Sequence, residues 1–268
     1  MGKAPVSRDF VYELLERKYK AYNNPRFIET DPICIPHLFT KKQDIEIAGF
    51  FTATIAWGNR KSIINSGRRI IELMDNAPYQ FITGHTDTDL KRFLKFAHRT
   101  FNATDALYFI EFFSHYYKQH QSLEDAFAAY LPVKTPHRGE ALIGFHDLFF
   151  SLDDAPQRTR KHVATPLRKS TCKRINMYLR WMVRHDNKGV DFGIWEKIKP
   201  AHLLIPLDVH VDRVARKLGL VKRKQTDWEA VLELTESLRS FDPKDPVKYD
   251  FALFGLGVLD KDELEKIY

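Results

Sequence analysis

Two side chains of this chain combine residue types and positions that suit chemistry. Asp208 follows the apolar run 204–207 and begins a short helical pattern that Gly219 ends. A carboxylate at this place can stabilise a developing positive charge or move protons. Lys173 lies in the first turn of another expected helix, and a neutral lysine amine is a nucleophile that can form a Schiff base. Together they would support a nucleophilic displacement assisted by a carboxylate.

Each of these residues also has a purely structural or binding interpretation. Asp208 could be an ordinary helix N-cap, and Lys173 could be one more phosphate contact. The two positions are 35 residues apart (208 − 173), so a long loop over 185–201 must fold back if they are to meet. Such a loop is tolerable because the entropy cost of closure grows slowly with length.

The segment around Lys173 is basic. No acidic residue occurs between Arg158 and Arg184, and the whole chain carries a net charge of +7. This indicates either a solvated basic face or a phosphate-binding surface. Ser170 is expected to cap the helix with a hydroxyl that reaches the amide of Lys173, and a turn before a helix N-terminus offers free amides to a phosphate. The candidate phosphate contacts in this segment are Arg168, Lys169, Ser170, Arg174, Arg180 and Arg184.

The elements that must position these residues are nearly all helices. Apolar residues recur at the 3.6-residue period in most segments, and strand-like alternation is scarce. Thr226 with Glu229 predicts a capping box, and Asp245 predicts a cap before a proline at the first helical position. Short breaks are expected at Pro132–Pro136 and Asp153–Pro156. The pattern predicts an all-α protein with a single compact helical domain over 1–268. Helices are expected over 48–55, 63–74, 104–113, 122–130, 142–149, 175–182, 209–218, 228–238 and 246–256.

Composition excludes several protein classes. The 29% of charged residues and the absence of a long apolar run argue against a membrane protein, and the N-terminus lacks an apolar signal region. Two cysteines, Cys34 and Cys172, make a disulfide framework improbable and cannot ligate a four-cysteine iron–sulfur cluster. We therefore expect a cytoplasmic protein that needs no cofactor and no metal, and we expect a monomer.

The residues around Asp208 resemble a known catalytic element. Pro206–His210 is similar to the Pro-Val-Asp-Thr-His element of the helix-hairpin-helix DNA glycosylases, the superfamily of endonuclease III and the 8-oxoguanine glycosylases, where the aspartate is catalytic. Lys173 matches a lysine that archaeal 8-oxoguanine glycosylases keep in the first turn of the second hairpin helix. The usual hairpin is rich in glycine, whereas 166–170 contains none.

This resemblance covers about 165–259 and implies both a fold and a function. The implied fold is the compact multi-helix fold of the helix-hairpin-helix glycosylases. The implied function is excision of a damaged base from double-stranded DNA, with Lys173 and Asp208 as catalytic residues and the nucleoid as the place of action. A Schiff base on Lys173 would add strand cleavage at the abasic site.

A second, fainter resemblance lies in the N-terminal half. Asp44–Lys61 is similar to the early helix and following turn of the same superfamily. In relatives a polar residue of this turn fills the space left by an extruded base. Asn59 or Arg60 would take that role, and the alternative is an ordinary connection between two helices.

The chain is also similar, over most of its length, to a bacterial family of unknown function. The similarity rests on Cys172–Arg184, Pro206–His210 and Asp245–Leu253, and it implies no activity. Besides the glycosylase, we consider a catalytically silent nucleic-acid-binding protein on the same fold. A metal-dependent hydrolase that uses Asp208, His210 and Asp212 is disfavoured because helix positions two apart do not face each other.

Overall fold

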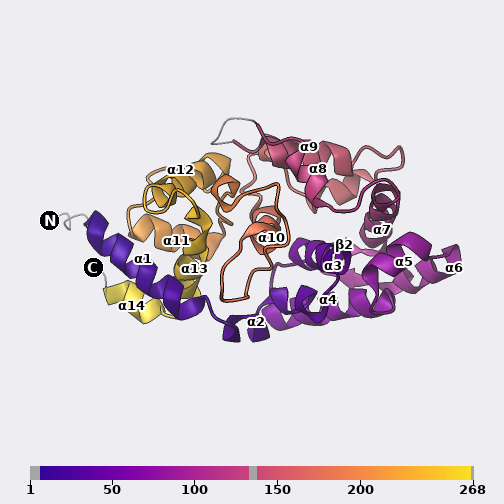
Figure 1. Ribbon diagram of the computed structural model, residues 1–268, viewed down its shortest axis with the longest axis horizontal. Coiled ribbons are helices and arrows are strands. Elements are labelled where there is room, and N and C mark those ends of the chain that lie inside the picture. Colours follow the sequence, from indigo (N-terminus) through magenta and orange to yellow (C-terminus); the bar gives the residue numbers. More distant parts are fainter. Residues whose placement is uncertain (1–6, 133–137, 267–268) are drawn as a thin grey trace. The chain divides into compact units, whose positions relative to one another are not determined.

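The computed structural model describes residues 7–132 and 138–266, and these are mostly helical (Figure 1). The chain divides into two compact units where the sequence predicts a single domain. The terminal unit consists of 1–27 and 166–268, and the central unit consists of 28–165. No helix among the described residues is long and apolar enough to cross a membrane.

The terminal unit combines the two ends of the chain. Short 3₁₀ turns lie at Pro166–Arg168, Pro200–His202 and Pro246–Tyr249. A short helix, α2 (Arg26–Thr30), connects this unit to the central unit. The other helices of the terminal unit are α1 (Arg8–Tyr22), α10 (Lys173–Val183), α11 (Val209–Lys217), α12 (Trp228–Arg239), α13 (Asp250–Val258) and α14 (Lys261–Lys266).

The core of the terminal unit is built around α13. This helix is apolar on all sides, as a helix buried among others must be, and it packs against α1 and α11. Gly257 lets α11 come close, because a Cβ at this position would lie 3.1 Å from the backbone oxygen of His210. Arg213 of α11 donates a hydrogen bond of 2.8 Å to the carbonyl of Gly257. Helix α13 therefore fixes the start of α11, where Asp208 lies.

The central unit contains the remaining elements. Its 3₁₀ turns lie at Pro32–Cys34, Pro36–Leu38, Lys91–Lys95 and Gln157–Lys161, and β1 (Ala97–His98) pairs antiparallel with β2 (Phe101–Asn102). Its helices are α3 (Lys42–Thr54), α4 (Arg60–Leu73), α5 (Pro78–Gly84), α6 (Asp87–Leu90), α7 (Ala103–Tyr117), α8 (Glu124–Ala128) and α9 (Glu140–Phe149).

A cluster of phenylalanines forms the core of the central unit. Phe50 of α3 contacts Phe109 and Phe113 of α7 and Phe149 of α9, with ring centroids 5.3–5.6 Å apart. Such edge and tilted contacts are the arrangements that aromatic rings prefer. The buried carboxylate of Glu46 also joins α3 to α7, because it accepts a hydrogen bond of 2.8 Å from the hydroxyl of Tyr117. Helix α3 is thus held firmly, and with it the turn that leads into α4.

The helical patterns of the sequence are confirmed, although some caps are wrong. Helices α3, α4, α9 and α12 lie where the periodicity predicts them. Asp227 rather than Thr226 caps α12, since its side chain accepts the amide of Ala230, while the Thr226 hydroxyl donates to Asp212. Apart from Pro132, the break predicted at Pro132–Pro136 lies outside the described residues.

Candidate functional site

The structure brings Lys173 and Asp208 together in the terminal unit. Lys173 is the first residue of α10, and Asp208 is the N-cap of α11. The distance from Lys173 Nζ to Asp208 Oδ2 is 4.0 Å, and their side chains are 26% and 22% exposed. The long connection between them does fold back. The two groups therefore share one partly open site that a ligand could reach.

Asp208 uses its two carboxylate oxygens differently. Oδ1 accepts the backbone amides of His210 at 2.9 Å and Val211 at 3.0 Å, which makes Asp208 a true helix cap. Oδ2 is the oxygen that faces Lys173. The cap therefore holds the carboxylate in a fixed orientation without occupying the oxygen beside the amine.

The start of α10 differs from the expected cap. Cys172, not Ser170, occupies the N-cap position, and its backbone lies in the left-handed region at φ 49°. The Ser170 hydroxyl accepts the amide of Cys172 at 3.2 Å and does not reach Lys173. Burial raises the pKa of the Cys172 thiol to about 12, so this neighbour is not a competing nucleophile. The prediction of Lys173 in the first helical turn is confirmed.

A second carboxyl group, which the sequence did not suggest, belongs to this site. Asp250 begins α13, is 5% exposed, and forms an ion pair with Arg180. Burial raises its pKa to about 6, while the charge of Arg180 lowers it, that of Asp208 raises it and that of Lys173 lowers it. Asp250 is therefore electrostatically linked to both members of the Lys173–Asp208 pair. No sequence signal singled out Asp250, because the helix expected over 246–256 places it in the interior and not at the start.

The raised pKa of Asp250 predicts a pH dependence of stability. Between about pH 4 and pH 6 the folded protein keeps a proton on this carboxyl that the unfolded protein has released. The stability that the protonated Asp250 gives the folded protein is thus fully present below pH 4 and is lost as the pH rises through 6. Asparagine stays neutral at every pH. Between pH 4 and pH 6 we therefore expect the free energy of unfolding of Asp250→Asn to rise relative to that of the unmodified protein, by up to about 3 kcal/mol. Urea unfolding at pH 4, 5, 6 and 7 measures the difference, and a difference independent of pH would contradict the prediction.

Arg180 and Arg184 need to be removed from the predicted phosphate contacts. Their side chains are 5% and 1% exposed. Arg180 pairs with Asp191 at 3.2 Å and with Asp250. Arg184 pairs with the carboxylates of Asp186 at 2.7 Å, Asp245 at 2.9 Å and Asp191 at 3.1 Å, and it donates to the Tyr19 hydroxyl. These arginines neutralise buried carboxylates and are not available to a DNA phosphate.

The loop before α10 retains exposed cations. Arg168 and Lys169 are both exposed, and Lys169 has a left-handed backbone with φ 57°. Arg174 is largely buried, and this burial lowers its pKa to about 10. Two apolar side chains adjacent in sequence to these residues and to Asp208 are also exposed, Leu167 at 69% and Val209 at 74%. The surroundings of the site thus offer both charge and apolar surface.

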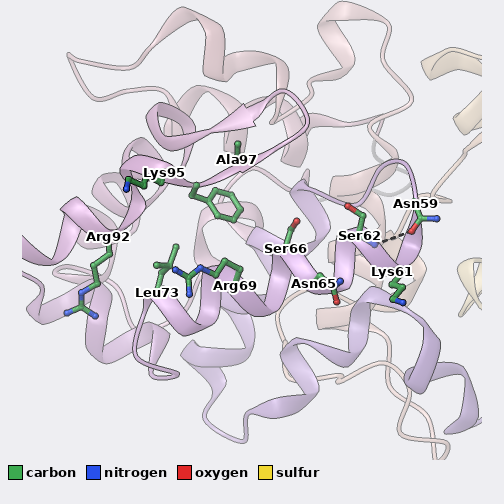
Figure 2. A pocket seen from close by; sticks show the side chains of 11 residues that line it. Asn59, Lys61, Ser62, Asn65, Ser66, Arg69, Leu73, Arg92, Lys95 and Ala97 are labelled. Carbon is green, nitrogen blue, oxygen red and sulfur yellow. Dashed lines mark hydrogen bonds between the residues drawn. The ribbon is translucent and has the colours of Figure 1, made fainter.

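Asn59 and Arg60 lie in the central unit, at the start of α4. The side chain of Asn59 accepts the amide of Ser62 at 3.1 Å and caps the helix, and Arg60 is the first helical residue. Lys173 belongs to the other unit. Asn59 also lines a hollow in the central unit (Figure 2).

No group of three metal-binding side chains occurs in the described ranges 7–132 and 138–266. Asp208 caps α11, and Asp212 pairs with Arg216 at 2.9 Å. The metal-dependent hydrolase considered from Asp208, His210 and Asp212 therefore has no ligand set among these residues.

Comparison with known proteins identifies the family and no activity. No curated protein and no solved structure matches the chain. One family model matches residues 31–259, which is most of the sequence and includes Lys173, Asp208 and Asp250. The chain belongs to the uncharacterised family described as "Protein of unknown function (DUF2400)".

Proposed function

We propose that the protein is a DNA glycosylase that removes a damaged base with Lys173 as nucleophile and Asp208 as its proton carrier. The observation that carries this proposal is the distance of 4.0 Å between Lys173 Nζ and Asp208 Oδ2 in a site that solvent reaches. The exposed cations Arg168 and Lys169, which precede Lys173 by five and four positions (173 − 168 and 173 − 169), suit a DNA backbone. The helix-hairpin-helix resemblance supports the same reading, and the fold type is part of the proposal.

The reaction begins with a proton transfer. Lys173 gives a proton to Asp208 Oδ2, and the freed nitrogen lone pair forms a bond to the sugar carbon C1′. The bond from C1′ to the base breaks, its electron pair leaves with the base, and the proton on Asp208 passes to that base. Asp208, which is again a carboxylate, then takes a proton from the nitrogen. The nitrogen lone pair forms the C=N bond and breaks the bond from C1′ to the ring oxygen O4′, which receives that proton from Asp208, and a protonated Schiff base joins Lys173 to the opened sugar.

The Schiff base allows a direct test. Borohydride delivers hydride to the imine carbon and leaves a stable secondary amine between protein and DNA. We expect a covalent complex when the protein, borohydride and duplexes with one oxidised, alkylated or deaminated base are combined. Lys173→Gln should abolish the complex, because an amide cannot form the imine. Lys217→Gln is the matched control and should still form the complex. Like Lys173, Lys217 is partly exposed, at 20%, and forms an ion pair, in its case with Glu265.

The substrate must be an intact damaged base, because abasic DNA traps many amines without specificity. Release without trapping would reassign Lys173 to phosphate binding and leave water as the nucleophile. If no lesion is released or trapped, the enzyme proposal fails and the catalytically silent nucleic-acid-binding protein is the better account.

Binding to duplex DNA has its own prediction. Arg168→Ala with Lys169→Ala should weaken binding and reduce the slope of log affinity against log salt by about 2, because each phosphate contact contributes about 0.9. Lys222→Ala with Lys224→Ala removes the same charge from exposed positions of the same unit and is the control. Fluorescence anisotropy over a salt series measures both slopes. Equal losses in the two variants would refute a specific role for the loop.

A further inference from the structure

The central unit contains a hollow that is lined by cationic side chains. The hollow has a volume of about 500 Å³ and runs along α4 (Figure 2). This volume is within the range of ligand sites. Four of its lining side chains are cationic and none is acidic. The cations are Lys61, Arg69, Arg92 and Lys95.

The residues of α4 that line the hollow form one stripe. Lys61, Asn65 and Arg69 follow one another at intervals of four, and such residues lie on the same face of a helix. At 1.5 Å per residue, Lys61 and Arg69 are separated by about 12 Å along the helix axis. Figure 2 shows Lys61 at one end of the hollow and Arg69, Lys95 and Arg92 toward the other. This spacing is too long for one phosphate group and suits an extended polyanion.

The cations of the hollow are not equally available. Arg92 is held by Asp75 and Asp89. Arg69 pairs with Glu72 at 3.3 Å, but these side chains are 61% and 55% exposed, and such surface pairs are weak. For Lys61 and Lys95, no carboxylate of residues 7–132 or 138–266 is within ion-pair distance. Both lysines are exposed, so the positive charge of the hollow comes mainly from them.

The rest of the lining is neutral and has two kinds of surface. Ser62 and Asn65 offer hydrogen-bond donors between the cations, and Asn59 caps the helix at the same end as Lys61. Ser66 is less available because its hydroxyl lies 2.8 Å from Nδ1 of the buried His98. Phe96 and Leu73, which are 7% and 6% exposed, form a small apolar wall with the exposed Ala97. Spaced cations with polar groups between them and an apolar side are what a strand with phosphates and flat bases requires.

We propose that this hollow along α4 binds a single-stranded segment of nucleic acid. Lys61 and Lys95 contact phosphates at its two ends, with Arg69 between them. The bases lie toward the apolar wall. The hollow belongs to the central unit and uses no residue of the Lys173 site, so this proposal does not depend on the glycosylase proposal.

The test uses the full chain and labelled oligothymidylates of one, two, four and eight nucleotides. We expect affinity to rise with length and then level off once the hollow is filled. Lys61→Ala with Lys95→Ala should weaken binding of the longest strand at least about tenfold and reduce the salt slope by about 1.4, since each contact with a single strand contributes about 0.7. Lys91→Ala with Lys118→Ala removes two exposed lysines of the same unit outside this hollow and should bind normally.

Three results would overturn the proposal. They are the absence of binding at low salt, equal weakening in both double variants, and equal binding of a polyglutamate peptide of the same charge. Urea unfolding of the variants shows whether they remain folded. None of these measurements needs a damaged base or Lys173, so a failure here leaves the glycosylase test intact, and the reverse also holds.

Discussion

Replacing Arg184 with methionine is expected to lower the free energy of unfolding by about 3–5 kcal/mol. The side chain is 1% exposed and holds three carboxylates, those of Asp186, Asp191 and Asp245. Burial by itself lowers the pKa of Arg184, but Asp245, Asp191, Tyr19 and Asp186 outweigh this effect and the pKa is raised. Methionine fills a similar volume and leaves Asp186 and Asp245 without this cation, while Asp191 keeps its ion pair with Arg180. Removing one partner of a largely buried ion pair is the costly way to break it.

The matched control is Arg168→Met. It makes the same substitution at an exposed position and should change stability by no more than about 0.5 kcal/mol. Arg184→Lys should fall between the two. Lysine keeps the charge, but it cannot reproduce the fork whose Nε binds Asp245 while Nη1 binds Asp191 and Nη2 binds Tyr19. Urea unfolding measures all three, and a loss below about 1 kcal/mol for Arg184→Met would mean that the network contributes little.

The local features of the fold were predictable from local patterns. Helices such as α3 and α4 follow from apolar residues at the helical period, which are then buried, for example Phe51 and Ile70. Caps were less predictable, because neighbouring polar residues compete for the same amides. Asp227 caps α12, whereas the hydroxyl of Thr226 donates a hydrogen bond to Asp212. The choice depends on contacts between elements and therefore cannot be read from one segment.

The division into units could not be predicted from the same patterns. Helix α1 packs on α13, more than 200 positions later, and so joins the C-terminal half. Its residue Tyr19 reaches Arg184 at 2.6 Å. Nothing in the periodicity of α1 shows which distant helix will cover its apolar face. This is the physical limit of a pattern that specifies a buried side but not a partner.

The candidate site, too, could be predicted only in part. The sequence could nominate Lys173 and Asp208, because each stands at the start of a helix and has a chemical use. It could not distinguish Arg180 from Arg168, since both occur in one run without acids. The two arginines differ because Arg180 pairs with acids from other parts of the chain. Asp191 belongs to the loop that follows α10, and Asp250 belongs to α13. Asp250 was missed because only the packing of α13 brings it close to Arg180.

The largest expected effect on activity is that of Asp208→Asn. We expect it to slow single-turnover base release at least about a hundredfold, the size of effect that a positioned proton carrier typically supplies. An amide cannot take a proton from Lys173 or return it to the departing base. Folding and DNA binding should be nearly unchanged, because asparagine caps helices about as well as aspartate. The lost ion pair with Lys173 is partly exposed and contributes little to stability.

Asp227→Asn is the control that separates chemistry from capping. Asp227 caps α12 as Asp208 caps α11, lies in the same unit, and also has a cationic partner, Arg223. Arg223 donates to both carboxylate oxygens of Asp227, at 2.7 and 2.5 Å, whereas Lys173 Nζ is 4.0 Å from Asp208, so Asp227→Asn removes a closer charged contact than Asp208→Asn does. If both variants lose base release equally, the defect lies in the fold of the unit. If Asp208→Asn unfolds, the residue is structural, and if it releases the base at the normal rate, Asp208 has no role in proton transfer. Loss in Asp208→Asn alone, with normal DNA affinity and an unchanged urea midpoint, is the result that assigns the oxygen facing Lys173 to the reaction.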